Sequence, residues 1–528
     1  MFVATTQIYL HVMREPGLGV RSPLDVARST EKICPGWLPL VTSSAMPVNI
    51  EFESARSRAV GATKLLVIGL DCAEPSLVFD KWSDQLPNLR ALMKRGAWTT
   101  MNSTVPPITV PAWSCMMASK DPGTLGIYGF RNRKDYSYAG LTFATSTAVK
   151  EPRLWDILSK AGKQCIVIGV PGTYPPSPVN GAMVSCFLTP DPATNQYTYP
   201  AHLRDEIDAL LGKNQYMVDV SDYRTENKDG VLREIYQMTD RRFTLAKHWV
   251  ESKPWDFFML VEMGVDRIHH AFWKYFDSQH RKFEPNSPFA DAIRQYYVHV
   301  DELIGELLAA LPEPDKTAIL VVSDHGAKRI DGGIAVNEWL IREGYLAVTE
   351  YPQQLRPLGK LIAEDKVDWS RTKAWSEGGY YARMFLNVKD REPHGIVEPA
   401  DYEALRDELT GKLGSLGDEN GTPIGTRVYR PQKLYHTCNG VWPDLVVIFG
   451  DLYWRSIGSI GYDAVHVFEN DTGPDDANHA QDAMFLLAGP GVNAGRITPI
   501  DILDVAPTLL KLYGLPIPAG MQGRALNL

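Results

Sequence analysis

Polar residues with metal-binding chemistry follow three apolar runs of this 528-residue chain. Asp71 follows KLLVIGL, Asp266 follows FFMLVEMGV, and Asp324 with His325 follow AILVV. Runs of this kind predict strands buried on both faces of a parallel sheet, whose carboxyl ends share the edge where open α/β sheets bind ligands. One aspartate at a strand end is most often a turn or capping residue. Three of them beside a histidine predict a site for a metal such as zinc or manganese.

A helical spacing adds further candidate ligands. Asp266 and His270 are four residues apart, so they share one face if a helix begins there, whereas His269 would point elsewhere. His479, which precedes the run AMFLLAGPG, would complete a three-ligand site with open positions, as a catalytic metal requires. The remaining candidates would hold a second ion: Asp71, Asp324 and His325. Two ions about 4 Å apart can bind the attacking and the leaving oxygen of an in-line displacement.

Thr109 is the candidate nucleophile. It lies in PPITVPAW, just before a helix predicted over Ala112–Ala118. A threonine at this position is also a common helix N-cap. Its hydroxyl could bind a metal and be activated as an alkoxide, while N–H groups at the helix start face a phosphoryl oxygen. Ser114 and Cys115 are weaker candidates because both fall inside the helical run.

The elements that must position these residues alternate between strand and helix. This alternation predicts βαβ units and an α/β fold, with a mostly parallel, doubly wound sheet flanked by helices. The predicted strands are Lys64–Leu70, Gln164–Val170, Asp256–Glu262, Ile319–Val322, Asp444–Gly450 and Ala483–Gly489. The predicted helices are Pro87–Arg95, Ala112–Ala118, Arg153–Ala161, Gly230–Val250, Ala290–Leu311 and Ile502–Tyr513.

The sequence predicts a short N-terminal extension followed by one large domain. Residues 1–62 show no sustained period, and we expect a poorly ordered N-terminal extension. Residues 63–528 are expected to form one catalytic domain. Within it, the strand and helix pattern weakens at about 187–250 and 345–435. We interpret these two segments as inserted cap regions that select the substrate.

Composition narrows the class of protein. A net charge of −9 and a hydrophobic content of 44% are typical of a globular protein and give no electrostatic footprint for nucleic acid. The six cysteines form no CxxC pair, which indicates free thiols in a reducing compartment. No run of about 18 apolar residues predicts a membrane span, and the N-terminus lacks the basic start of a secretory signal. We therefore expect a cytoplasmic protein, and nothing in the sequence indicates its oligomeric state.

Taken in order, these residues resemble the alkaline phosphatase superfamily, and most closely its type I phosphodiesterase/nucleotide pyrophosphatase family. The motifs that carry the resemblance are LLVIGLD, PPITVPAWSCMMASKDPGTLGIYGF, GVDRIHHAFW, VVSDHGA and NHAQDAMFLLAGPGV. The resemblance spans roughly residues 64–515 and implies an alkaline phosphatase-like fold with Thr109 as a covalent nucleophile. It implies one metal on Asp71, Thr109, Asp324 and His325, and another on Asp266, His270 and His479. Zinc is the expected metal, with manganese or iron as alternatives.

Two departures from the family pattern concern the substrate. Phe130 stands about where animal-type members carry a phosphate-binding asparagine, and Leu125 replaces the usual histidine. Arg131 or Arg133 could supply the lost contact, and an arginine there would favour more anionic substrates. Some aromatic residues could stack on a base or ring, although aromatic residues more often pack in a core: Trp113, Tyr380 and Tyr381.

We therefore predict a two-metal-dependent phosphoric ester hydrolase that acts on a nucleotide or another small phosphoester through a phospho-threonine. The resemblance favours diester or pyrophosphate bonds. Two alternatives remain open at this point. One is a phosphomutase or phosphomonoesterase of the same superfamily, and the other is a protein that binds a phosphate ligand without catalysis.

Overall fold

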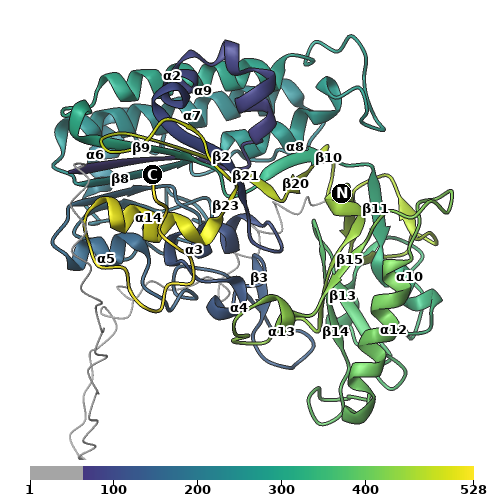
Figure 1. The fold of residues 1–528 in the computed structure, drawn as a ribbon. Helices are drawn as coiled ribbons and strands as arrows, with labels where there is room; N and C mark the ends of the chain where they lie inside the picture. The colour runs from purple at the N-terminus through teal and green to yellow at the C-terminus, as the bar shows by residue number, and fades with distance from the viewer. Residues whose placement is uncertain (1–62) are drawn as a thin grey trace, which may run out of the picture.

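The computed structural model describes residues 63–528, so the N-terminal extension predicted for residues 1–62 lies outside the described residues (Figure 1). A ten-stranded sheet forms the larger lobe. Its strands are β1 (Lys64–Leu70), β2 (Gly96–Asn102), β5 (Cys165–Ile168), β6 (Gly181–Val184), β7 (Thr198–Tyr199), β8 (Phe257–Glu262), β9 (Thr317–Val322), β21 (Asp482–Ala488), β22 (Gly495–Arg496) and β23 (Ile500–Asp501).

The spatial order is β22-β2-β21-β9-β1-β8-β5-β6-β7, with β23 beside β2. The inner strands β9, β1, β8, β5 and β6 are parallel to one another. At the margins, β21 is antiparallel to β9, β2 is antiparallel to β21, and β7 is antiparallel to β6. The inner strands are apolar throughout because helices cover both faces of the sheet.

Two helical layers enclose this sheet, as Figure 1 shows. One layer contains α2 (Pro87–Arg95), α6 (Leu203–Leu211), α7 (Lys228–Ser252), α8 (Gly264–Phe276) and α9 (Ala292–Ala309). The other contains α3 (Thr109–Ala118), α5 (Leu154–Lys160) and α14 (Val505–Leu512). The predicted α/β class with a mostly parallel, doubly wound sheet is therefore confirmed.

A second, smaller lobe lies beside the first and has a hydrophobic core of its own (Figure 1). Its main sheet has the order β13-β14-β16-β15. The strands of that sheet are β13 (Ala374–Glu377), β14 (Ala382–Leu386), β15 (Arg427–Tyr429) and β16 (Leu445–Ile448). The other elements of the lobe include β11 (Gly332–Ala335), β17 (Trp454–Ile457), β19 (His466–Val467), α10 (Val336–Arg342) and α12 (Tyr402–Gly414).

The two weakly patterned segments contribute differently to these lobes. Residues 345–435 lie in the second lobe, whereas residues 187–250 supply β7 to the large sheet and α7 to a layer that covers it. The strand predicted at Asp444–Gly450 forms as β16, but we expected it among the last strands of the large sheet and that placement was wrong. An apolar run reports burial, and it does not specify which sheet buries it.

The connections place several chain segments at one edge of the large sheet. Because β1 lies between β8 and β9 and is parallel to both, the residues after these three strands lie side by side. Because β21 is antiparallel to β9, its beginning lies at that same edge. The short strand β20 (Ala477–Ala480) leads into β21 and pairs with β10 (Gly326–Arg329), which brings His479 opposite Ala327.

No helix within residues 63–528 is long and apolar enough to cross a membrane.

Candidate metal centre and nucleophile

Residues that follow β1 and β9 form one half of the candidate centre. Asp71, Asp324 and His325 are each 0% exposed. His325 Nε2 lies 3.1 Å from Asp324 Oδ2 and 3.9 Å from Asp71 Oδ1. The backbone N–H of Cys72 donates to Asp324 Oδ1 at 3.1 Å, which leaves Oδ2 directed toward the histidine.

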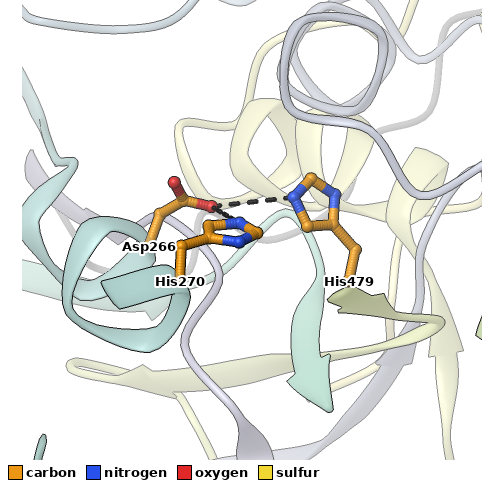
Figure 2. A group of neighbouring side chains, drawn as sticks. All are labelled: Asp266, His270 and His479. Atoms are coloured by element: carbon orange, nitrogen blue, oxygen red, sulfur yellow. Dashed lines mark ion pairs between the residues drawn. The ribbon is translucent and has the colours of Figure 1, made fainter. Parts of the chain in front are cut away.

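The other half comes from α8 and β20, as Figure 2 shows. Asp266 lies in the first turn of α8, and the helical spacing brings His270 Nε2 to 3.3 Å from Asp266 Oδ1. His479 Nε2 approaches the same oxygen to 3.7 Å. One ligand atom of each of these three residues lies within 4.8 Å of the other two. His269 is directed away from this group, with Nε2 3.2 Å from the hydroxyl of Tyr297.

Asp266 also connects the two halves. Its carboxylate, Asp71 and His325 form a second group whose ligand atoms lie within 4.8 Å of one another. Our prediction placed Asp71, Asp324 and His325 on one ion and Asp266 on the other. The structure brings all six side chains together at one sheet edge, with Asp266 between the two sets.

Each of the three histidines presents Nε2 to the centre because Nδ1 is already used. His325 Nδ1 lies 3.1 Å from the carbonyl of Gly326, and His479 Nδ1 lies 2.8 Å from the carbonyl of Pro107. His270 Nδ1 lies 2.7 Å from Asp475 Oδ1. An oxygen of this kind accepts a hydrogen bond, so Nδ1 carries a proton and Nε2 is the atom that can bind a metal. Burial opposes the charged form of His270, but Asp475 and Asp266 raise its pKa to about 9, so this ring must lose its Nε2 proton when a metal binds.

Three buried carboxylate oxygens of the centre make no hydrogen bond with any residue in 63–528: Asp71 Oδ1, Asp266 Oδ1 and Asp324 Oδ2. Burial and the charge of Asp266 raise the pKa of Asp71 well above its usual value. Burial and the charge of Asp71 do the same to the pKa of Asp324. Buried carboxylate oxygens without a hydrogen bond are costly, and a cation between them would offset both the desolvation penalty and the mutual repulsion. The set of donors therefore fits divalent metal ions.

The imidazoles are suited to the same role. Burial lowers the pKa of His325 to about 4, and burial with the neighbouring His325 lowers the pKa of His479 well below its usual value. Both rings are therefore neutral near pH 7 and need lose no proton to bind a metal. Burial opposes the charged form of Asp266, but His270 and Arg267 hold its pKa well below the usual value.

Thr109 lies beside this centre at the N-terminus of α3. Its Oγ1 is 3.2 Å from His325 Nε2, and the residue is 3% exposed. It is the first residue of the helix, and Ile108 occupies the N-cap position, so the alternative reading of Thr109 as an N-cap is wrong. The first intrahelical bond runs from Ala112 N–H to the Ile108 carbonyl, and the N–H groups before it point out of the helix end.

Two neighbours of the centre have roles that the sequence did not indicate. Trp113 was a candidate for stacking on the substrate, but it is 0% exposed and its indole N–H donates to Asp71 Oδ2 at 2.6 Å, so it orients a carboxylate from within the core. Gly69 permits this contact, because a Cβ there would lie 2.5 Å from the Trp113 ring. Asp475 is the second neighbour. It lies in the polar stretch TGPDDAN, whose composition is that of an ordinary surface turn.

The arginines proposed for substrate binding lie in β3 (Arg131–Arg133), which pairs with β4 (Leu141–Phe143). Arg133 is 7% exposed and forms an ion pair with Glu392 of the second lobe at 3.3 Å. It also donates to the carbonyls of Tyr136 and Ser137, so its known contacts are structural. Phe130 packs against Phe187 with ring centroids 6.0 Å apart.

Two solved structures share the fold of this chain. The murine ectonucleotide pyrophosphatase/phosphodiesterase 5 structure is 13% identical to this chain, covers 87% of it and 97% of its own length, and has a TM-score of 0.51. The human ectonucleotide pyrophosphatase/phosphodiesterase 5 structure is 13% identical, covers 88% and 97%, and has a TM-score of 0.50. At this identity the likeness shows a shared fold. None of the curated proteins matches the sequence.

A sequence model of one family matches residues 65–475, which is most of the chain and includes β1, β8, β9 and α3. His479 lies just beyond the matched segment, and β20 brings it to the centre. The chain belongs to the type I phosphodiesterase/nucleotide pyrophosphatase family.

Proposed function

We propose that this protein is a two-metal-dependent phosphoric ester hydrolase that acts through a phospho-threonine at Thr109. The observation that supports it most is the position of Thr109 Oγ1, 3.2 Å from Nε2 of the candidate ligand His325. That nitrogen also lies near Asp71 Oδ1 and Asp324 Oδ2, two buried oxygens that make no hydrogen bond within residues 63–528. Family membership supports the coarser statement that the protein hydrolyses phosphoesters.

In this proposal Asp71, Thr109, Asp324 and His325 hold one divalent ion, and Asp266, His270 and His479 hold the other. When bound, the ions supply positive charge to the phosphoryl oxygens and lower the pKa of a coordinated hydroxyl. We propose zinc as the metal, with manganese or iron as alternatives.

The chain's own residues then perform two displacements. Thr109 Oγ forms a bond to phosphorus as the bond to the leaving oxygen breaks, and the hydroxyl proton passes to solvent. The N–H groups at the start of α3 face the phosphoryl oxygens and stabilise their charge. A water molecule next attacks the phospho-threonine, releases the phosphate product and restores the Thr109 hydroxyl. Trp113 holds Asp71 in place throughout, through its hydrogen bond at 2.6 Å.

The substrate in this proposal is a nucleotide or another small phosphoester, with a preference for diester or pyrophosphate bonds. The segments 187–250 and 345–435 would select the leaving group. Each sends an aromatic ring to His270: Tyr223 lies 5.6 Å from the imidazole centroid, and Tyr380 lies stacked at 5.1 Å. A cytoplasmic location is part of the proposal and would be tested by fractionation of the native cells.

The test is a screen of p-nitrophenyl monoesters, p-nitrophenyl diesters and dinucleoside pyrophosphates with purified protein, first in Zn²⁺ and then in Mn²⁺. We expect metal-dependent hydrolysis. Mass spectrometry of acid-quenched protein should find on Thr109 a phosphate from a monoester, and a phosphate that keeps its second ester group from a diester or a dinucleoside pyrophosphate. Transfer of phosphate to a second hydroxyl would indicate a phosphomutase. Metal binding without turnover of any ester would indicate a binding protein.

A further inference from the structure

The carboxylate of Asp475 is buried next to the candidate metal centre, although it is not itself a candidate ligand. Its side chain is 0% exposed, and Oδ1 accepts the Nδ1–H of His270 at 2.7 Å. The corresponding nitrogens of His325 and His479 donate to backbone carbonyls. Among the candidate histidine ligands, His270 is therefore the one whose orientation depends on a side chain.

The other oxygen of Asp475 is held by groups from distant parts of the chain. Arg224 donates to Oδ2 from Nε at 3.0 Å and from Nη2 at 2.9 Å, and Arg455 of β17 donates from Nη1 at 3.3 Å. The hydroxyl of Tyr380 lies 3.2 Å from the same oxygen and accepts from Arg224 Nη2 at 2.7 Å. Arg224 belongs to the segment 187–250 and Tyr380 to the segment 345–435, so both segments meet at this carboxylate.

We propose that Asp475 is the positioning residue of the metal centre, which orients His270 and connects it to the two segments expected to select the substrate. The inference rests on the proposed metal centre. Carboxylates that accept the second N–H of a metal-binding histidine set its tautomer and ring orientation, and their loss typically weakens metal affinity about 10–100-fold. The two arginines and the tyrosine in turn restrict the carboxylate to one geometry.

The variant Asp475→Asn has a specific predicted effect. An asparagine has one acceptor oxygen, and the N–H donors of Arg224 and Arg455 would occupy it. The amide NH₂ would then face His270 Nδ1 and donate to it. The imidazole proton would move to Nε2, the nitrogen that should bind the metal. The variant keeps the size of the side chain while it disables one ligand.

The test measures metal binding and requires no substrate. Zn²⁺ affinity is obtained by competition with a chromophoric chelator, and the visible spectrum is recorded after loading with Co²⁺. For D475N we expect one of the two ions to bind about 10–100-fold more weakly, with an altered Co²⁺ spectrum, while the other ion binds as in the wild type. Wild-type affinity for both ions with an unchanged spectrum would overturn the proposal, as would equal weakening of both ions.

The chain offers a matched control. Glu392→Gln neutralises a carboxylate that is also 0% exposed and paired with two arginines, but that contacts none of the candidate ligands. It should lower thermal stability and leave the affinity for both ions unchanged. If D475N does not fold, Arg224→Met tests the same point because it removes two of the donors that hold Asp475. A selective loss of affinity at one ion supports the proposal, and wild-type affinity contradicts it.

The hydrolase proposal can fail separately from this one. A wild-type protein that binds two ions but hydrolyses no ester would remove the proposed function and leave the role of Asp475 intact. A hydrolase in which D475N binds both ions normally would do the reverse.

Discussion

The imidazole rings of His325 and His479 lie stacked, with centroids 3.8 Å apart and an angle of 14° between their planes. His325 follows the parallel strand β9, and His479 precedes the antiparallel strand β21 that pairs with β9. Because β21 runs antiparallel to β9, the start of β21 and the end of β9 lie at the same sheet edge, which brings together two histidines that are distant in sequence. Both rings are buried and neutral near pH 7, which is the protonation state that a metal ligand needs.

Removal of bound metal should destabilise the protein. Without cations, Asp71, Asp266 and Asp324 each keep a buried oxygen without a hydrogen-bond donor among residues 63–528. We expect EDTA to lower the apparent Tm by several degrees, since an ion at a hundred times its Kd contributes about 2.7 kcal/mol. Scanning calorimetry with and without Zn²⁺ would measure this. In Asp266→Ala the EDTA effect should be much smaller, and an undiminished effect would place the metal elsewhere.

Replacement of Thr109 should abolish turnover, and it also removes one of the four proposed ligands of one ion. Thr109→Ala removes the proposed nucleophile, and we expect kcat to fall at least about a thousandfold, as is common for a covalent nucleophile. Thr109→Ser keeps a hydroxyl and should retain part of the activity. Steady-state kinetics with a p-nitrophenyl diester would measure these changes.

Ser114→Ala in the same helix is the control, and its kcat should stay close to that of the wild type. Comparable losses of kcat in the two alanine variants would show that Thr109 is not the nucleophile.

Trp113→Phe should weaken the Asp71 side of the centre. The change removes the indole N–H that Asp71 Oδ2 accepts at 2.6 Å and leaves a buried carboxylate oxygen unpaired. The expected cost is about 1–3 kcal/mol of unfolding free energy in the metal-free protein, with a lower affinity for one ion. Urea denaturation and chelator competition would measure the two effects.

Trp155→Phe provides the comparison for this variant. Trp155 is 1% exposed, and its indole nitrogen has no hydrogen-bond partner among residues 63–528. The substitution should therefore cost less and leave metal affinity unchanged. If both tryptophan variants behaved alike, the effect would come from packing and the hydrogen bond to Asp71 would have no special role.

His280, which is not a candidate metal ligand, should contribute to acid sensitivity. Burial lowers its pKa to about 4 in the folded protein. Its Nδ1 accepts the Lys282 N–H at 3.0 Å, a bond that protonation would break. Between about pH 6.5 and 4 the unfolded chain binds a proton at this residue that the folded chain does not. The unfolding free energy should therefore fall as the pH falls through this range, by about 1–3 kcal/mol from this residue.

The corresponding measurement is urea denaturation of the metal-free protein at several pH values. His280→Gln should reduce the slope of stability against pH between about 6.5 and 4. His202→Gln changes an exposed histidine and should leave the slope as it is in the wild type. A slope that H280Q does not alter would show that other groups account for the acid sensitivity.

The sequence pattern by itself determined many of the strands and helices, and it determined which residues are candidate metal ligands. The strand Lys64–Leu70 and the helix Pro87–Arg95 form at the predicted residues, because apolar runs and helical periodicity are properties of neighbouring positions. The pairing of Asp266 with His270 follows from helical spacing in the same way. Parallel connection of strands was enough to expect Asp71 and Asp324 at one edge.

Only the tertiary structure decided which side chains contact and orient the candidate ligands. The contact between Trp113 and Asp71, and the one between Asp475 and His270, depend on side-chain direction across the fold, which no local period records. The ion pair of Arg133 with Glu392 and the membership of β16 in the second sheet likewise depend on how two lobes pack. Hydrogen bonds and ion pairs form between groups that are near in space, so their partners emerge when the chain has folded.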